Sequence, residues 1–311
     1  MKNKNNEEHT WSKRRRYKKN LEDYILDTFI YIFLAALCIV TIYPFWYIVC
    51  VSLSTPEAIA KAGGIMFWPH GFELSNYKTV LFSEDFYRFF RNSIFYVAVG
   101  TAISMILTIF IAYPLSKKKL IGRKYLMIFC LITMYFSGGL IPSYLLVVNG
   151  LGWYGNILAI LIPGAISTYN MIVLRSNFEQ IPHELFESAE IDGADEMYIL
   201  WKIVLPLAVP GLAVVALFYA VAIWGNWFSA NLYLPRNREL WPLAMYLREV
   251  LAQGNVNSLQ AQMSGSTGSG PQIAKALKLT TAVLTVVPIL VVYPFIQKYF
   301  VKGVMLGSVK G

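Results

Sequence analysis

Five long, mostly apolar intervals of the sequence contain no charged side chain, and they constrain the fold more than any other feature. They are residues 28–56, 92–116, 125–174, 203–235 and 279–297. A helix that crosses the hydrocarbon core of a bilayer needs about 20 mostly apolar residues. Four intervals therefore hold one crossing each, and the third is long enough for two, with a turn in the glycine-rich stretch 149–156. The sequence predicts an all-α integral membrane protein with six transmembrane helices.

The composition excludes an ordinary soluble protein. Of the 311 residues, 56% are hydrophobic and only 14% are charged, whereas soluble chains carry about 25% charged residues. The net charge of +9 could suggest nucleic acid, but the basic residues gather beside the predicted spans, so we expect no nucleic-acid partner. The cysteines lie within apolar runs and the histidines are scattered, so we expect neither disulfides nor a metal site.

The placement of lysine and arginine predicts the orientation, because basic residues accumulate in the cytoplasmic segments of membrane proteins. With the N-terminus inside, 18 of the 27 basic residues are cytoplasmic. We therefore expect both termini in the cytoplasm. The predicted segments are a basic tail (1–26), a first helix (27–50), an extracellular segment (51–91), a domain with helices two to six (90–296) and a cytoplasmic tail (297–311).

Two loops of the domain 90–296 have distinct compositions. The extracellular loop 233–278 contains a glycine–serine cluster at 265–270, which we interpret as a flexible connection. No Lys-Ser/Thr pair follows that cluster, as a phosphate-binding loop would require, and no Walker A pattern occurs elsewhere. Energy for any active transport must therefore come from a partner.

The cytoplasmic loop 180–206 is acidic in an otherwise basic chain. Six of the eighteen acidic residues fall between Glu184 and Glu196. Gly193 permits the positive φ at which many helices end, so we predict two short helices broken at Asp192-Gly193, with Asp195 and Glu196 in the first turn of the second. The apolar positions expected at helical spacing are Leu185, Ala189, Met197, Leu200 and Val204. A structured acidic loop at a membrane surface is typical of a docking site for a soluble partner.

The loop also resembles a known motif. Its residues Glu-Ser-Ala-x-x-Asp-Gly-Ala (187–194), followed after eight residues by Ile-x-Leu-Pro (203–206), are similar to the EAA loop of ABC importer permeases. Ser188 departs from the usual alanine, a change between two small residues. The resemblance implies that the loop docks in a cleft of an ATPase, where the carboxylate of Glu187 needs a hydrogen-bond donor. The implied coupling residues are Glu187, Ser188, Ala189, Asp192, Gly193, Ala194, Leu205 and Pro206.

Further motifs narrow the family. The C-terminal Gln-x-x-Phe-x-x-Gly (297–303) and Gly-x-x-Lys-Gly (307–311) resemble the MalG-like half of carbohydrate-uptake ABC permeases. Asn92-Ser93 and Trp224-x-Asn226 are similar to the same family. The stretch Ser-Gly-Gly-Leu-Ile-Pro (137–142) points to its LplC-like branch in Gram-positive bacteria. The implied substrates are complex oligosaccharides, including uronate-containing ones derived from pectin or alginate, and the implied fold of 90–296 is the MetI-like type-1 permease domain.

The resemblance implies an importer with several subunits in the bacterial plasma membrane. An extracellular lipid-anchored solute-binding protein would deliver the oligosaccharide to a pore made by this chain and a homologous second permease, as a heterodimer in membrane lipid. Two copies of an ABC ATPase would bind ATP and Mg²⁺. The chain itself is expected to bind no cofactor and to catalyse no reaction.

The predicted spans hold aromatic and amide side chains but almost no ionisable ones. Carriers coupled to protons or ions normally keep acids or histidines at membrane depth, so a secondary transporter is disfavoured. Aromatic faces beside amides suit sugars, but the same residue types also form the interfacial belt and pack helix ends. The candidates for a substrate path are Trp224, Asn226, Trp227, Asn231, Tyr135 and Asn170, with Tyr43, Trp46 and Tyr47 as weaker ones. No Lys or Arg at membrane depth offers a counter-ion for uronates, which the second permease could supply.

Three alternatives remain at this stage. An ABC permease for a non-sugar solute, such as amino acids or phosphate, is disfavoured by the C-terminal Gly-x-x-Lys-Gly. A membrane-embedded enzyme would need histidines or acids clustered near one membrane face, and the acidic cluster here is the loop 180–206. A membrane scaffold would not need the Asp192-Gly193 turn.

Overall fold

The computed structural model describes residues 21–263 and 270–307 of the chain, and every regular element in these residues is helical. The chain divides into two compact units, Met1–Tyr47 and Ile48–Gly311. The described part of the first unit is one helix, α1 (Leu21–Ser52), which extends a few residues into the second. The described residues thus confirm the all-helical class that the sequence predicts.

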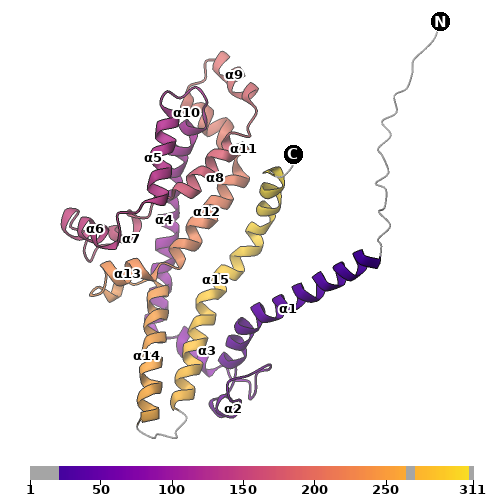
Figure 1. Cartoon of the computed structure of the whole chain (residues 1–311). Coiled ribbons are helices and arrows are strands. Elements are labelled where there is room, and N and C mark those ends of the chain that lie inside the picture. Colours follow the sequence, from indigo (N-terminus) through magenta and orange to yellow (C-terminus); the bar gives the residue numbers. More distant parts are fainter. Residues whose placement is uncertain (1–20, 264–269, 308–311) are drawn as a thin grey trace. The chain divides into compact units, whose positions relative to one another are not determined.

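Four helices form the centre of the second unit (Figure 1). The long helix α4 (Glu84–Ser116) packs against α8 (Thr168–Phe178) and α12 (Val209–Trp224), and α12 also packs against α15 (Gly270–Gly307). A buried core joins α8 and α12 near one end of this group. Its largest fully buried side chains are Met171, Leu174, Phe178, Ile199, Leu200, Val204 and Val215. In the same core, the Tyr219 hydroxyl is 2.7 Å from the Thr108 hydroxyl and accepts a hydrogen bond from the Ser167 amide.

A second core lies towards the other end of α4. Phe89, fully buried, packs against Trp241 with a centroid distance of 6.2 Å. The Trp241 indole donates a 2.7 Å hydrogen bond to the Leu234 carbonyl, and the Asn92 amide donates to the carbonyls of Glu239 and Trp241. The Phe89–Trp241 ring contact and the Asn92 hydrogen bonds fasten the segment 234–241 to α4, whereas the bond from the Trp241 indole to Leu234 lies within the segment.

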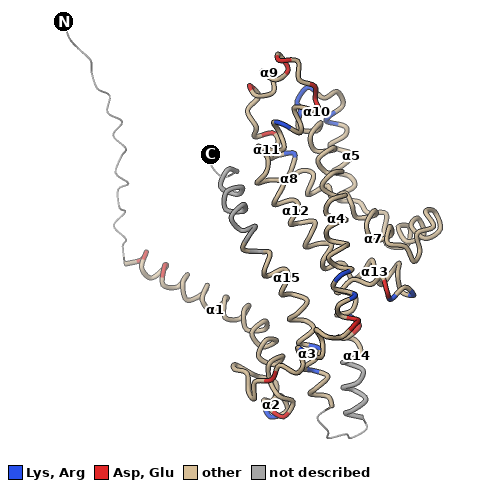
Figure 2. The backbone as a smooth tube through the Cα atoms, turned by 180° about the vertical axis from the view of Figure 1, so that it is seen from behind, with Lys and Arg blue, Asp and Glu red and all other residues tan. Residues whose placement is uncertain are grey.

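Charged residues gather at two ends of the second unit (Figure 2). They lie around α9 (His183–Ile191) and α10 (Glu196–Ile199), and again around α2 (Pro56–Lys61), α3 (Ser75–Leu81) and α13 (Trp227–Tyr233). Between these ends, α4 exposes apolar side chains such as Ile106 and Phe110. A band of exposed apolar surface between two charged ends matches the hydrocarbon core of a bilayer.

The structure leaves the predicted number of six spans unconfirmed. Among the described residues, three helices are long and apolar enough to cross a membrane: α1, α4 and the part of α15 up to Val292. Two bent pairs raise the number to five if each pair counts as one span. They are α5 (Arg123–Tyr135) with residues 140–150, bent by 106°, and residues 196–207 with α12, bent by 84°. The six predicted helices are therefore not confirmed.

The interval 125–174 does not form two simple helices. α5 ends before Gly138-Gly139, where Gly139 has φ +86°, and a series of short elements follows before α8 begins. These are α6 (Leu140–Leu145), a π-helical turn η1 (Leu146–Gly150) and α7 (Leu158–Leu161). The predicted turn at 149–156 lies inside this excursion. The helix ends before the paired glycines, because Gly139 has a positive φ that side chains disfavour, and Pro142 lies in the first turn of α6, where proline is tolerated.

The segments 203–235 and 233–278 also differ from the prediction. Residues 203–235 hold α11 (Leu205–Leu207), α12 and α13, with a break at Gly225 and Asn226. The predicted extracellular loop contains a one-turn helix η3 (Arg238–Leu240), the long helix α14 (Leu243–Met263) and the start of α15 at Gly270. α14 packs along α15, which makes the two helices a hairpin. Residues 264–269 of the predicted flexible connection lie outside the described residues.

Candidate functional site

The acidic loop forms the two short helices that the sequence predicts. α9 ends at Ile191, and Gly193 follows with φ +79°. The Gly193 amide donates to the Glu190 carbonyl and the Ala194 amide donates to the Ala189 carbonyl, at 3.1 and 2.9 Å. This pair of hydrogen bonds is the Schellman arrangement, in which a left-handed glycine satisfies the last carbonyls of a helix. The predicted break at Asp192-Gly193 is confirmed.

The second helix of the loop starts at a capping residue. The Asp195 side chain accepts a 2.8 Å hydrogen bond from the Tyr198 amide, which satisfies one of the free N–H groups of the first turn. Glu196 lies in that first turn, as expected. Its helix passes without interruption into a π-helical turn, η2 (Leu200–Val204), and then into α11. The wide turn lies just before Pro206, whose ring would clash with the carbonyl four residues earlier in a regular α-helix.

The apolar stripe predicted for this helix is partly wrong. Leu200 and Val204 are buried, but Met197 is 46% exposed, and Ile199 takes the buried position instead. The wide turn explains the difference, because it changes the register between the first turn and the residues that follow. Of the expected pair on α9, Ala189 is buried and Leu185 is largely exposed.

Most of the predicted coupling residues share one surface. Ser188, Ala189, Asp192, Gly193 and Ala194 line a hollow of about 660 Å³, together with Asp195, Tyr198, Lys202 and Ile203. Glu187 borders a different hollow of about 680 Å³, between α9 and the ends of α4 and α8. Leu205 and Pro206 lie in α11 and line neither hollow. The structure therefore brings together five of the eight residues, around the Gly193 turn.

Polar contacts tie the loop to the end of α4. The Tyr113 hydroxyl donates a 2.6 Å hydrogen bond to the Glu196 carboxylate, and Lys117 forms an ion pair with the same oxygen. The Lys117 ammonium also lies 4.8 Å from the centre of the Tyr113 ring. Partial burial favours the neutral form of Glu196, but the hydrogen bonds from Lys117 and Tyr113 outweigh it and lower the pKa of the carboxyl. Glu196 is thus ionised at neutral pH.

A second cluster joins three helix ends. The Arg123 and Arg175 side chains both donate through Nε to the Leu115 carbonyl, at 2.8 and 3.1 Å. Both guanidinium groups also pair with the Glu179 carboxylate. Leu115 lies in the last turn of α4, where carbonyls lack a partner within the helix. The cluster therefore holds the end of α4, the start of α5 and the end of α8 in one arrangement.

Sequence reasoning did not identify these two polar clusters. It used Lys117 and Arg123 only to set the orientation of the helices. The one local signal was the i,i+4 spacing of Arg175 and Glu179, which is typical of a helical ion pair. The other contacts join residues that are far apart in the sequence.

The predicted path residues fall into different environments. Trp224 is 7% exposed, and its indole donates a 3.1 Å hydrogen bond to the Thr285 carbonyl of α15. Tyr135 is 75% exposed at the end of α5, and Asn170 is buried in the first turn of α8. The Asn226 side chain accepts a hydrogen bond from the Ser229 amide and caps α13. The weaker candidates Tyr43, Trp46 and Tyr47 lie on α1, within the first unit.

Trp227 and Asn231 do come together, one turn apart on α13, and an unpredicted residue joins them. The Arg248 guanidinium of α14 lies 4.5 Å from the centre of the Trp227 ring. Its Nη1 donates a 2.7 Å hydrogen bond to the Asn231 side-chain oxygen. Sequence reasoning counted Arg248 among the charges of an extracellular loop. The many polar residues of α14 suggested a loop, so the sequence did not predict a helix that packs against α13.

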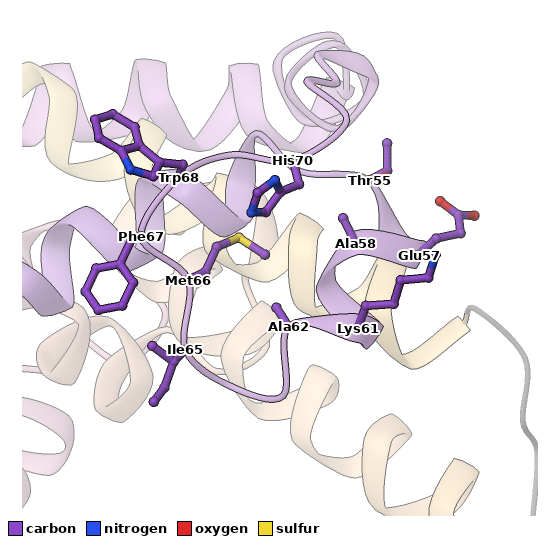
Figure 3. A pocket seen from close by; sticks show the side chains of 10 residues that line it. All are labelled: Thr55, Glu57, Ala58, Lys61, Ala62, Ile65, Met66, Phe67, Trp68 and His70. Atoms are coloured by element: carbon purple, nitrogen blue, oxygen red, sulfur yellow. The ribbon is translucent and has the colours of Figure 1, made fainter.

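A further hollow of about 650 Å³ lies in the segment after α1, beside α2 (Figure 3). Met66 and His70 line it from the loop, and Glu57 and Lys61 line it from α2. The His70 amide donates a 3.1 Å hydrogen bond to the Ser54 hydroxyl, which holds the loop in place. No group of three or more His, Cys, Asp or Glu that could hold a metal ion occurs in the part of the chain that was described.

Comparison with known proteins places this arrangement in a family. Residues 104–306 match the sequence profile described as "Binding-protein-dependent transport system inner membrane component". The chain is 38% identical over 291 residues to the polygalacturonan/rhamnogalacturonan transport system permease protein YtcP of Bacillus subtilis (strain 168), which covers 94% of this chain and 100% of that one. It is 40% identical over 291 residues to the protein LplC of the same organism, covering 92% of this chain and 95% of that one.

A solved structure agrees with these relatives. The chain resembles a subunit in the crystal structure of a bacterial ABC transporter involved in the import of the acidic polysaccharide alginate. The TM-score is 0.80 and the sequence identity is 33%, and the match covers 91% of this chain and 99% of that one. The profile spans well over half of the chain, and relatives above 30% identity span nearly all of it. The chain therefore belongs to the inner membrane components of binding-protein-dependent ABC transport systems.

Proposed function

We propose that this chain is one permease subunit of an ATP-driven importer that carries acidic oligosaccharides, derived from pectin or alginate, into a bacterial cell. The observation that carries the proposal is the likeness, over nearly the whole chain, to a subunit of an importer of an acidic polysaccharide. A relative of similar length is named for the transport of polygalacturonan and rhamnogalacturonan, which are also acidic. The maltodextrin permease MdxG of Bacillus subtilis, whose named substrate is a neutral sugar, is 30% identical to this chain. That identity is lower than the identity to either of the two proteins above.

The proposed topology has six spans with both termini in the cytoplasm. The bias of lysine and arginine towards segments 1–26, 117–124 and 298–311 supports it. α9 and α10 then face the cytoplasm, and the hairpin of α14 and α15 begins outside. The two bent pairs would each make one span. The sixth span would then come from α8 together with the segment between Gly150 and α8.

The proposed partners follow from what this chain lacks and from its family. Its sequence contains no Walker A pattern, so two copies of a partner ATPase would bind ATP and Mg²⁺. A homologous second permease would complete the pore, and a lipid-anchored solute-binding protein would deliver the substrate. The two Bacillus relatives favour the plasma membrane of a Gram-positive bacterium.

The proposed mechanism uses the hollow around Gly193 as the contact with the ATPase. Residues Ser188 to Ala194 offer backbone and acidic groups to a cleft of the partner, and closure of the ATPase dimer would move them. The continuous helix from Glu196 to Leu207 and the contacts of Glu196 with α4 would pass that movement to the spans. This is transmission by rigid elements, as in hinge and shear movements.

Uptake by whole cells tests the proposed function. In a strain without the gene for this chain, uptake of labelled oligogalacturonides or alginate oligosaccharides should be lost and should return when the gene is restored. Unchanged uptake of every acidic oligosaccharide tested would contradict the proposal. Loss of amino-acid or phosphate uptake instead would favour a permease for a non-sugar solute.

A further inference from the structure

Arg248, Trp227 and Asn231 form a compact polar group on two packed helices. Trp227 and Asn231 belong to α13 and Arg248 belongs to α14. The guanidinium lies over the indole at 4.5 Å and donates to the Asn231 side chain at 2.7 Å. The group follows directly after the break at Gly225 and Asn226, where α12 ends and α13 turns away.

The charge of Arg248 is not neutralised by the side chains around it. The neighbouring Arg238 pairs with both Asp85 and Glu249, at 3.1 and 2.9 Å. In contrast, no carboxylate of the described side chains lies within ion-pair distance of Arg248. Glu249, which follows Arg248 in the chain, is therefore already paired with Arg238, and no described carboxylate neutralises Arg248.

The geometry leaves hydrogen-bond donors free for an anion. The guanidinium lies over the Trp227 ring, and it has further N–H donors besides the one that Asn231 accepts. Because the Asn231 oxygen accepts that bond, the NH₂ group of the same side chain can donate to an anion as well. A carboxylate can accept from both, and charge-assisted hydrogen bonds of this kind are the strong ones.

The aromatic rings provide the second half of the site. Trp227 is 38% exposed and Phe228, next to it, is 45% exposed, and their rings lie edge to face at 5.6 Å. Exposed ring faces suit the C–H faces of a sugar, while an adjacent cation suits an acid group on the same sugar. We propose that Arg248, Asn231 and Trp227 bind the carboxylate and ring of one uronosyl residue of the transported oligosaccharide. This proposal rests on the proposed function and supplies the counter-ion that the sequence alone did not reveal.

The test compares two substrates with the same sugar chain, one with free carboxylates and one with neutral methyl esters. The complete transporter, with its ATPase and solute-binding protein, is reconstituted in liposomes, and uptake of an oligogalacturonide is measured beside that of its fully methyl-esterified form. Arg248→Gln should lower uptake of the acid about tenfold or more at limiting concentration and leave uptake of the ester unchanged. Arg248→Lys should recover part of the loss, because the charge returns without the planar fork. Arg236→Gln, an exposed outer arginine with the same charge change, should affect neither substrate.

The other outcomes each contradict the proposal. An equal loss for both substrates in Arg248→Gln would mean that Arg248 only fastens α13 to α14. If the loss of uptake in Arg248→Gln changes with the anionic lipid content of the liposomes and not with the charge of the substrate, the site binds a lipid headgroup instead. If the wild-type transporter takes up the ester but not the acid, the carboxylate site is wrong while import of sugars stands. If it takes up neither, the proposed function has failed and this inference fails with it.

Discussion

Replacing Gly193 with valine tests whether the turn at the end of α9 shapes the coupling surface. Gly193 has φ +79°, and a Cβ added there would meet no atom within 4 Å. The whole cost is therefore backbone strain rather than a clash with a neighbour. A left-handed conformation costs an ordinary residue about 1–2 kcal/mol, and about 3 kcal/mol is a reasonable upper limit for a strained non-glycine position.

The strained turn has a direct route to relief. If φ becomes negative, the hydrogen bonds from Gly193 to Glu190 and from Ala194 to Ala189 are lost, and α9 and α10 separate. A penalty of 1–3 kcal/mol on the docking conformation corresponds to about 5- to 150-fold weaker binding of the ATPase. The spans should still insert, since their long apolar helices are stabilised by the bilayer itself. We expect a membrane-inserted permease that retains little ATPase and transports poorly.

The assay is co-purification of the ATPase together with substrate-stimulated ATP hydrolysis in liposomes. Gly152→Val is the matched control, because Gly152 has φ +68° and open space around it but lies far along the chain from the loop. Gly193→Asn should behave nearly as wild type, because asparagine tolerates the left-handed region. Normal coupling in Gly193→Val, or an equal loss in Gly152→Val, would refute the reasoning.

Three other predictions use single positions. With the native cysteines removed, a cysteine at Ser188 should not react with a membrane-impermeant reagent in intact cells, whereas one at Arg236 should; the reverse would invert the topology. Trp227→Ala should weaken transport by about 0.5–1.5 kcal/mol with basal ATP hydrolysis intact, and unchanged uptake at limiting substrate would leave it a packing residue. Asn226→Ser should preserve the cap of α13, whereas Asn226→Ala should cost about 1 kcal/mol of stability in thermal unfolding; if the serine variant loses transport, Asn226 has a second role.

The sequence predicted the Gly193 turn because the information for it is local. A left-handed glycine needs only its own missing side chain and the carbonyls of the helix before it. The cap at Asp195 is local in the same way. Both features can therefore be read from a dozen residues, whatever the rest of the chain does.

The helix breaks in 125–174 were not predictable from charge or apolar content. The stretch at Gly138-Gly139 and the one after Ile162 contain no charged residue, so they look continuous with the helices beside them. Their effect depends on backbone conformation, which apolar content does not measure. α14 was missed for the opposite reason. Its polar residues suggested a loop, whereas packing against α13 and α15 stabilises it as a helix.

The contacts that would carry motion were also beyond the sequence, because they are non-local. Arg175 and Leu115 are separated by 60 positions, and Tyr113 and Glu196 by 83. Residue types alone do not show which arginine meets which carbonyl. The orientation argument used these cations only as charges at a membrane surface.

The arrangement of these contacts limits how the loop can move. The Glu196 carboxylate is held from the end of α4 by Tyr113 and Lys117, so a shift of α10 away from α4 would break both contacts. Arg123 and Arg175 share the same carbonyl at the end of α4, so α5 and α8 are bound to that helix as well. A force on the hollow around Gly193 would therefore displace α4, α5 and α8 together, while the 84° bend at Ala208 is where α12 can change its angle to the loop.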